Sequence, residues 1–552
     1  MQFTLKQISS LEKIRNAADL NCAEVFQKTA MAGERVSYQI CLNGTPALRN
    51  ISVSLESELA DHITLYDVKS VVMDRPTTYP DLEPEDYITL EPGLMPDLMV
   101  PLSLQNNLTQ VSPYATTLWV RVDIPKDTTP GTYMIKITYH LFQQDHLDCE
   151  LSTTMKLEVI PAVLPEQKLI YTRWFYADCI ADYHNVEVYS EKHWELIEKY
   201  IAAAADVGIN MILVPVHTPP LDTEIGTTRT CVQLVDIEKK GDLYEFNFDK
   251  FHRFIDICKR NNIKYFEIAH MFSQWGAKCA PNIMVTENGV KDYMFGWHVA
   301  ANSPEYIAFL KQYIAAISAE LVKSGISENT YFHISDEPGL HTIDTYKIAS
   351  DIMRPLIGSS KTFDALSKYE FYENGLVECP VTGVAHIHDF LEHQIPNQWT
   401  YYCCGPQQVF TNDFMAMPSY RTRIIGFQMY RYDIKGFLHW GLNFYNSSRS
   451  TYHINPYVTT SSDGAFPSGD PFILYPGQDS VFGCIRGEVF YEALQDMRIC
   501  QALEQLIGRE AVVQMIDDAA GYTLRFDRYP KGNQYTENLR TAMIEKIKEL
   551  TA

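Results

Sequence analysis

The chain has 552 residues, of which 46% are hydrophobic and 21% charged, a composition typical of a globular protein with room for more than one domain. Its formal net charge of −23 argues against a nucleic-acid partner, because phosphate binding needs clustered Lys and Arg, and no basic run is present. Aromatic residues make up 12% of the chain, a surplus that suits a sugar-binding cleft as well as a core.

The first residues predict neither export nor membrane insertion. Residues 1–7 contain no apolar core of signal-peptide length, and no uninterrupted apolar run is long enough to span a bilayer. The twelve cysteines show no CxxC or finger-like spacing, so we expect free thiols in a reducing cytoplasm. Cys403 and Cys404 are the one adjacent pair. We expect two buried thiols there, with a strained vicinal disulfide as the alternative.

Residues 1–160 are predicted to form an N-terminal all-β sandwich. Short segments separated by Pro and Gly turns, with little helical periodicity, indicate strands of such a fold. The clearest segments are residues 36–42, 51–55, 117–124, 132–138 and 155–160. Asn43-Gly44 is a turn signal that would end the first of them. The Pro-bounded stretch 161–165 is expected to be a stiff linker.

From about residue 170 strands and helices alternate, and Ser190 and Ser303-Pro304 are typical starts of two of the helices. Eight strands are predicted, at residues 170–175, 211–216, 263–270, 331–335, 362–366, 381–386, 399–404 and 436–444. Residues 161–487 should therefore form a (β/α)8 TIM-like catalytic barrel, and residues 488–552 a helical part packed on it. An open doubly wound sheet is the alternative. It would normally carry a Gly-rich phosphate loop after its first strand, which is missing, and we expect no cofactor.

Asp336 and Glu337 are the strongest candidates for catalysis. They follow an apolar strand and precede Pro338-Gly339, so both carboxyl groups should lie at the carboxyl end of the fourth strand. That end of a barrel is where its chemistry is found. A Glu held there near neutral pKa suits protonation of a glycosidic oxygen. The alternative is that Asp336 caps the next helix and Glu337 is an ordinary first-turn acid.

The second carboxylate of an ordinary retaining glycosidase is missing. That group would attack the sugar from ~5 Å away, and in many barrels it is a Glu at the end of the seventh strand. No Glu occurs from His393 through Gly487. A substrate with a 2-acetamido group can supply the nucleophile itself by closing to an oxazolinium ion. Adjacent acids can then divide the work, with Asp336 orienting the acetamido N–H and Glu337 protonating the leaving group.

The chain resembles glycoside hydrolase family 123, whose characterised members are exo-acting β-N-acetylgalactosaminidases. The likeness rests on Ser335-Asp336-Glu337-Pro338-Gly339, on the eighth-strand segment 437–445 and on residues 467–470, within the same order of sandwich, barrel and helical part. It implies that Asp336 orients the acetamido group and that Glu337 acts as acid and then as base. The preference for galactosamine is implied by the likeness alone.

Five further residues are predicted from their position to contact the sugar, and each also has a purely structural interpretation. They are Trp440, Tyr402, Asn443, Asp470 and His270. Trp440 would stack under the ring, Tyr402 and Asn443 would reach hydroxyls or the acetamide, Asp470 would bind the 4- or 6-hydroxyl, and His270 would face the mouth. No metal is expected, because the zinc-like segment 386–389 lacks a third ligand.

The leading prediction is a retaining β-N-acetylhexosaminidase that acts on an oligosaccharide or glycoconjugate with a terminal N-acetylgalactosamine. One alternative is a β-glycosidase of another sugar that uses two enzyme carboxylates, one of them an unrecognised Asp. The other is a catalytically silent carbohydrate-binding protein in which the sandwich binds the sugar. We expect no nucleic-acid or membrane partner, and the sequence leaves the oligomeric state open.

Overall fold

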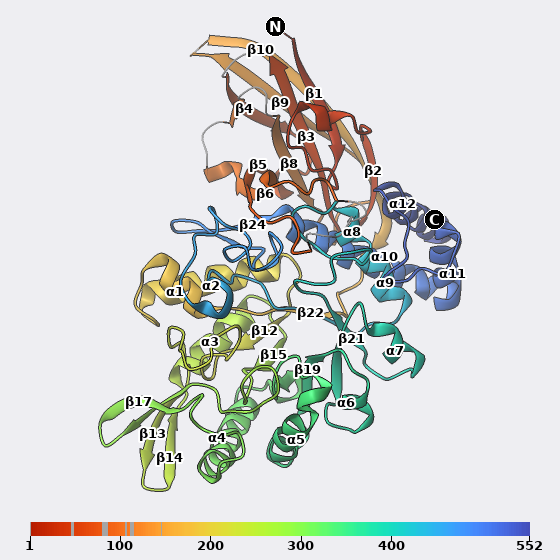
Figure 1. The fold of residues 1–552 in the computed structure, drawn as a ribbon. Coiled ribbons are helices and arrows are strands. Elements are labelled where there is room, and N and C mark those ends of the chain that lie inside the picture. The colour runs from red at the N-terminus through yellow and green to blue at the C-terminus, as the bar shows by residue number, and fades with distance from the viewer. Residues whose placement is uncertain are drawn as a thin grey trace.

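The computed structural model describes residues 2–45, 49–79, 87–104, 108–110, 115–144 and 146–551. A β-rich domain occupies one end of the molecule and a closed barrel the other, and the C-terminal helices lie at the junction of the two (Figure 1). The order of these parts agrees with the predicted fold class. Among the described residues, no helix combines the length and the apolar character needed to cross a bilayer.

The N-terminal domain consists of two sheets whose facing side chains form a separate core, with Tyr38, Leu118 and Ile137 among its fully buried members. Antiparallel pairing dominates, and β2 and β10 pair in parallel. The first sheet has the order β1 (Gln2–Ser9), β3 (Arg35–Thr45), β8 (Thr116–Asp123), β5 (Ile63–Met73), β6 (Gly93–Pro101), β24 (Val481–Cys484) and β23 (Tyr475–Pro476). The second has the order β2 (Gln27–Ala32), β10 (His146–Val163), β9 (Gly131–Gln143), β4 (Arg49–Glu56) and β7 (Leu108–Gln110).

Two local predictions in this domain are wrong. Asn43-Gly44 does not end a strand, because β3 continues through both residues and pairs with β1. Gly44 leaves room there for the ring of Phe3 on the neighbouring strand, since a Cβ atom would lie 2.1 Å from that ring. Residues 161–163 are not a free linker, because β10 runs to Val163 and pairs there with Ala32. In both places cross-strand packing overrides the local turn signal.

The barrel contains all eight predicted strands, and β22 closes it by pairing with β11. The strands are β11 (Ile170–Arg173), β12 (Met211–Val214), β15 (Tyr265–Ile268), β18 (Thr330–Phe332), β19 (Lys361–Leu366), β20 (Cys379–Gly383), β21 (Trp399–Tyr401) and β22 (Gly436–His439). The sixth strand ends at Gly383, earlier than predicted. His386 and His388 therefore lie in a turn and the first turn of a helix, so they do not share a strand face as a zinc site would require.

The helices on the outside of the barrel start largely where capping signals placed them. The Ser190 side chain accepts a hydrogen bond from the amide of His193, and Ser303 accepts one from the amide of Tyr306. Helices of this layer are α1 (Ala177–His184), α2 (Glu191–Asp206), α3 (Asp249–Arg260), α4 (Pro304–Lys323), α5 (Ile343–Ile357), α6 (Glu370–Glu373), α7 (Ile387–Glu392), α8 (Tyr420–Arg423) and α9 (Ile425–Arg431).

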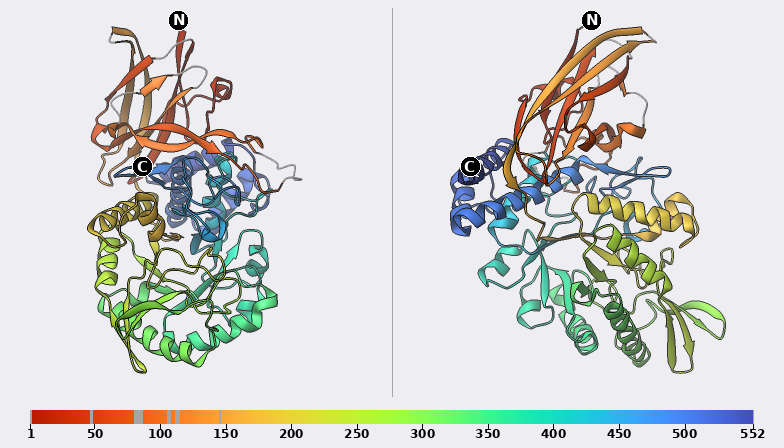
Figure 2. Two further views of the ribbon diagram at one scale, coloured as in Figure 1. Left: turned by 60° about the vertical axis from the view of Figure 1, so that its left-hand side comes forward. Right: turned by 180° about the vertical axis from the view of Figure 1, so that it is seen from behind.

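Two insertions complete the molecule. Hairpins in the loops after β12 and β15 join into a small sheet that projects from the barrel (Figure 2). Its strands are β13 (Asp236–Lys240), β14 (Leu243–Asn247), β16 (Ile283–Glu287) and β17 (Val290–Phe295). After the barrel the chain adds β23 and β24 to the N-terminal sheet and then forms α10 (Ile485–Ile507), α11 (Arg509–Ala520) and α12 (Gln534–Thr551).

A buried ion pair fastens the N-terminal domain to α10. The Arg486 guanidinium contacts both carboxylate oxygens of Asp97 on β6, at 2.9 and 3.0 Å, and Tyr475 donates to the same carboxylate at 2.7 Å. Both charged side chains are almost completely buried. Removing one partner of such a pair leaves the other charge without compensation.

We therefore expect Asp97→Asn to lower the free energy of unfolding by about 3–5 kcal/mol, measured by urea denaturation. Glu56→Gln removes the exposed pair between Glu56 and Lys136, and it should cost less than about 1 kcal/mol. Equal effects of the two substitutions would contradict the structural role of the buried pair.

Candidate active site

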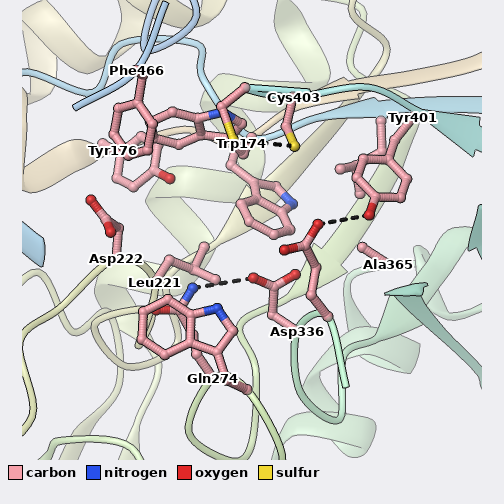
Figure 3. Close-up of a pocket in the computed structure, with 15 residues that line it drawn as sticks. Trp174, Tyr176, Leu221, Asp222, Gln274, Asp336, Ala365, Tyr401, Cys403 and Phe466 are labelled. Atoms are coloured by element: carbon pink, nitrogen blue, oxygen red, sulfur yellow. Dashed lines mark hydrogen bonds between the residues drawn. The ribbon is translucent and has the colours of Figure 1, made fainter. Parts of the chain in front are cut away.

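A pocket of about 590 Å³, including its open mouth, lies at the carboxyl ends of the barrel strands (Figure 3). Aromatic side chains supply much of its wall, and Asp336 and Glu337 face it together. The lining residues are Trp174, Tyr176, Leu221, Asp222, Gln274, Trp275, Asp336, Glu337, Ala365, Tyr401, Cys403, Cys404, Leu438, Trp440 and Phe466. Apolar walls with a few convergent polar groups are typical of a small-ligand site.

The loop after β18 places the two carboxyl groups. Backbone hydrogen bonds tie it to both neighbours: the Trp275 amide donates to the carbonyl of Asp336, and the Glu337 amide donates to that of Ala365 on β19. Glu337 has φ = 42°, a left-handed conformation that is unfavourable for a residue with a side chain. Such strain persists only where the surroundings hold the backbone, and it concentrates at functional sites.

Each acid has its own hydrogen-bond partner. Gln274 donates to Asp336 Oδ2 at 3.1 Å, and the Tyr401 hydroxyl donates to Glu337 Oε1 at 2.6 Å. Burial, and then the negative charge of Glu337, raise the pKa of Asp336 well above its usual range, against the opposing hydrogen bond from Gln274. Asp336 is buried while Glu337 is exposed to the pocket.

A buried network lies directly behind this pair. His333 on the same loop contacts Asp364 at 3.0 Å and Glu267 at 2.8 Å. Burial alone would lower the pKa of His333, but the hydrogen bonds to Asp364 and Glu267 raise it to about 9, so the ring carries a positive charge at neutral pH. Asp364 also accepts the backbone N–H groups of Ile334 and Ser335. The network thus fixes the loop that presents Asp336 and Glu337.

The same network does not suit a metal ion. Ligand atoms of His270, His333 and Asp364 lie within 4.8 Å of one another. Both ring nitrogens of His333 are already occupied by carboxylates, and its ring stacks on His270 at 3.9 Å with an interplanar angle of 14°. Stacked rings do not point toward one common ligand position as metal-binding imidazoles do.

Of the five additional sugar-contact candidates, Trp440 alone lines the pocket. Its indole N–H donates to Asp470 Oδ2 at 2.9 Å, and its ring packs against Phe444 and Phe466. Asp470 is fully buried behind Trp440 and does not line the pocket. In this position Asp470 orients the indole of Trp440. This role differs from the prediction, in which Asp470 binds a sugar hydroxyl.

Tyr402, Asn443 and His270 are fully buried outside the pocket lining. Tyr402 packs edge-on against Phe437 and His439. The Asn443 amide exchanges two hydrogen bonds with the backbone of Tyr176, at 3.0 Å each. His270 stacks on His333 as described above. The structure therefore gives these residues supporting positions around the pocket and none at its surface.

Several lining residues had no signal in the sequence analysis. Trp174, Asp222 and Gln274 lie in the loops after β11, β12 and β15, where the sequence marks no motif. Tyr401 could have been found, because it neighbours Tyr402 at the end of β21. Adjacent residues of an extended chain point to opposite faces. The sequence prediction chose Tyr402, which points into the core, and missed Tyr401, which points into the pocket.

Replacing Tyr401 tests the hydrogen bond to Glu337. Tyr401→Phe removes the donor to the Glu337 carboxyl group, and a group left without its partner costs about 1–3 kcal/mol, so activity should fall roughly 5- to 100-fold. Tyr402→Phe is the matched control, because the buried Tyr402 hydroxyl has no hydrogen-bond partner. Its kcat should stay within about twofold of wild type. A larger loss for Tyr402→Phe than for Tyr401→Phe would contradict this assignment.

A closed barrel that places an acidic pair in an aromatic pocket at its carboxyl ends is typical of glycoside hydrolases, and the comparisons with known proteins agree. The family model described as the catalytic domain of glycoside hydrolase 123 matches residues 174–503. The model of the family's N-terminal domain matches residues 12–140. The chain belongs to glycoside hydrolase family 123.

A solved structure of a family 123 glycoside hydrolase from Clostridium perfringens has a TM-score of 0.75 and 15% identity, covering 100% of this chain and 97% of that chain. At this identity the likeness shows the fold alone. A family 5 xyloglucanase from Bacteroides ovatus matches with a TM-score of 0.30 and 8% identity over 89% of this chain and 100% of its own. No curated protein sequence matches the chain.

Proposed function

We propose that this glycoside hydrolase is an exo-acting, retaining β-N-acetylgalactosaminidase that works by substrate-assisted catalysis, with the barrel of residues 161–487 as its catalytic part. One observation carries the proposal. Asp336 and Glu337 face the pocket together, while the end of the seventh strand presents Tyr401 and two cysteines in place of a carboxylate nucleophile. The acetamido oxygen of the substrate then takes the part of that nucleophile.

In the first step the acetamido oxygen attacks the anomeric carbon of its own ring. Asp336 accepts the acetamido N–H, which orients the group and stabilises the positive charge of the oxazolinium ion. Glu337 donates a proton to the departing glycosidic oxygen. In the second step Glu337 takes a proton from a water molecule whose oxygen attacks the anomeric carbon. This attack opens the oxazolinium ring and restores the β configuration.

The raised pKa of Asp336 suits a group whose charge state changes when the substrate binds. Burial, and then the charge of Glu337, favour the protonated form of Asp336 in the free pocket. An acetamido N–H that donates to Asp336 favours its ionised form. Binding of the substrate therefore favours the carboxylate that ring closure needs.

The rest of the pocket fits a single sugar ring. Trp174 and Trp440 offer aromatic faces for the C–H side of the pyranose. Asp222 lies on the wall opposite the acidic pair and is held by the backbone N–H of Arg449 at 2.9 Å (Figure 3). Its carboxylate is placed to accept hydrogen bonds from hydroxyl groups on the far side of the ring, and burial raises its pKa to about 6.

The choice of N-acetylgalactosamine over N-acetylglucosamine rests on the family relationship. None of the pocket contacts described above favours one of these sugars over the other. The study of the Clostridium perfringens enzyme concerns hydrolysis of glycolipid glycans. We extend the sugar preference to this chain, acting on an oligosaccharide or glycoconjugate with a terminal N-acetylhexosamine, and assign no particular aglycone.

The position of Asp222 in the pocket lining supports one alternative function, a glycosidase that acts on another sugar with two enzyme carboxylates. Asp222 is the remaining carboxylate among the described residues that line the pocket. If Asp222 were the nucleophile, a 2-deoxy-2-fluoro glycoside would form an ester on it that mass spectrometry detects. If the acetamido group is the nucleophile, no ester forms and Asp222→Asn mainly raises KM.

A screen of aryl β-glycosides tests the proposal directly. Four head groups should be compared: N-acetylgalactosamine, N-acetylglucosamine, galactose and glucose. We expect turnover of the acetamido sugars, with galactosamine preferred, and competitive inhibition by a thiazoline mimic of the oxazolinium ion. Hydrolysis of plain galactoside at a comparable rate would refute substrate assistance, and sugar binding without turnover of any head group would favour a silent binding protein.

The pH profile of Glu337→Gln offers a separate test. Burial and the charge of Glu337 together raise the pKa of Asp336, so removing that charge should lower the pKa. Because ring closure needs the ionised form of Asp336, the acid-side fall of kcat/KM should move to lower pH than in the wild type. The measurement uses an aryl glycoside, which needs little protonation. An acid limb that stays in place or moves upward would contradict the role of Asp336.

A further inference from the structure

Two thiols form part of the pocket wall, and the proposed reaction uses neither of them. Cys403 and Cys404 follow the seventh strand, line the pocket and are free and half-buried. Their sulfur atoms lie 3.9 Å apart. In Figure 3 the Cys403 sulfur lies on the same side of the pocket as Tyr401, which holds Glu337.

The backbone around the two thiols is firmly held. The Cys403 amide donates to the carbonyl of Gly405 at 3.1 Å, and the Cys403 carbonyl accepts from Asn412 at 3.0 Å. Gln407 donates to the Cys404 carbonyl at 2.8 Å and itself accepts hydrogen bonds from Thr77 and Thr78 of the N-terminal domain. The segment that carries the two thiols therefore loses little conformational entropy when one ligand binds both sulfurs.

The separation of the sulfurs fits a single bridging atom. Two bonds of ~2.3 Å to one atom place two sulfurs roughly 3.3 to 3.8 Å apart as the angle between the bonds opens from a right angle to the tetrahedral value. A small side-chain rotation covers the difference from the 3.9 Å of the free thiols. Among the described residues, the pocket lining adds no third Cys or His to the pair. The other ligands that a four-coordinate cation could use in this lining are carboxylates, and the proposed reaction uses those of Asp336 and Glu337. A trivalent arsenical carries its own third substituent and needs only the two sulfurs.

We propose that Cys403 and Cys404 form a two-thiol site that binds monosubstituted trivalent arsenicals and that its occupation blocks the sugar site. The reaction joins RAs(OH)2 and two thiols. Two As–S bonds form, two As–O bonds break, and each thiol proton leaves with one hydroxyl group as water. Arsenic stays trivalent and no oxidant is consumed.

Protonation of the Cys403 thiol agrees with this stoichiometry. The hydrogen bond with Cys404, and then burial, raise the pKa of the Cys403 thiol well above its usual range. A protonated thiol is a poor nucleophile toward alkylating reagents that attack one sulfur at a time. The two thiols should consequently react more readily with an arsenical, which forms a bond to each sulfur, than with an alkylating reagent, which forms a bond to one.

The experiment uses the full chain and phenylarsine oxide. We expect the intact mass to rise by one bridged phenylarsenic group, and a peptide map to locate the bridge at Cys403 and Cys404. Cys403→Ser and Cys404→Ser should each lose this adduct, while Cys279→Ser, which removes a half-buried thiol outside the pocket, should keep it. A bridge mapped to other cysteines, or an adduct that survives both single replacements, would overturn the site.

Activity provides the second readout. Glycosidase activity of the wild type should fall at least tenfold on capture and return with 2,3-dimercaptopropanol, while an equal concentration of thiol supplied as 2-mercaptoethanol should restore little. Each variant is compared with its own untreated activity. The peptide map needs no turnover, so failure of the thiol site and failure of the proposed glycosidase activity are separable. Mapped capture with undiminished activity would overturn the blocking of the sugar site.

Discussion

Asp336→Asn should abolish most of the activity on every substrate, whatever its leaving group. Ring closure precedes departure of the aglycone, and the neutral amide cannot balance the positive charge of the oxazolinium ion. Losing one preorganised electrostatic partner in an active site costs roughly 10²–10³ in kcat, and here a full charge is lost. The introduced amide also lies beside Gln274, whose side-chain N–H donates to Asp336 in the wild type. The measurement is kcat on nitrophenyl and natural β-linked N-acetylgalactosamine.

The control for this substitution is Asp344→Asn, an identical replacement of an exposed aspartate in the first turn of α5. It should leave kcat within about twofold, because exposed polar replacements away from the site change little. A thiazoline inhibitor should bind Asp336→Asn much more weakly than wild type, since it carries the same developing charge. Activity of Asp336→Asn within tenfold of wild type on either substrate would remove the basis for substrate assistance.

Glu337→Gln should divide substrates by their leaving group. General acid catalysis contributes roughly 10²–10⁴ in rate, so natural linkages should lose that much. Aryl glycosides with a nitrophenolate leaving group should lose at least tenfold less, because that anion departs without a proton. The pocket keeps its shape in this variant, since the introduced amide still offers an oxygen to the Tyr401 hydroxyl that now donates to Glu337. Equal losses on both substrate types would contradict the assignment of Glu337 as the acid.

Azide sharpens this test in the same variant. The second step needs Glu337 as a base toward water, but an anionic nucleophile needs no deprotonation. Azide should therefore accelerate Glu337→Gln on the aryl substrate and yield the β-glycosyl azide, while Asp336→Asn should gain nothing. An α-glycosyl azide would indicate a different stereochemical course and would exclude a retaining mechanism.

The local sequence was enough to predict the barrel strands and the position of the acidic pair. Strands and caps depend on residues within a few positions of one another, as with Ser303 and the amide of Tyr306. Asp336 and Glu337 stand out because an apolar strand precedes them and Pro338-Gly339 follows. The same local evidence failed at Asn43-Gly44, where a turn signal lies inside a strand opposite Phe3.

What the sequence determined by itself is therefore the barrel, its preceding sandwich and the strand end that carries two acids. Only the tertiary structure decided which other side chains reach them. Gln274 comes from the loop after β15 and Tyr401 from the end of β21, each more than 60 residues away from the acid it contacts, a separation that no periodicity encodes. Tyr401 ends β21 and Tyr402 follows it directly, yet Tyr401 lines the pocket and touches Glu337 while Tyr402 packs behind the pocket. Local patterns specify elements, whereas a pocket is specified by loops that meet after the barrel has closed.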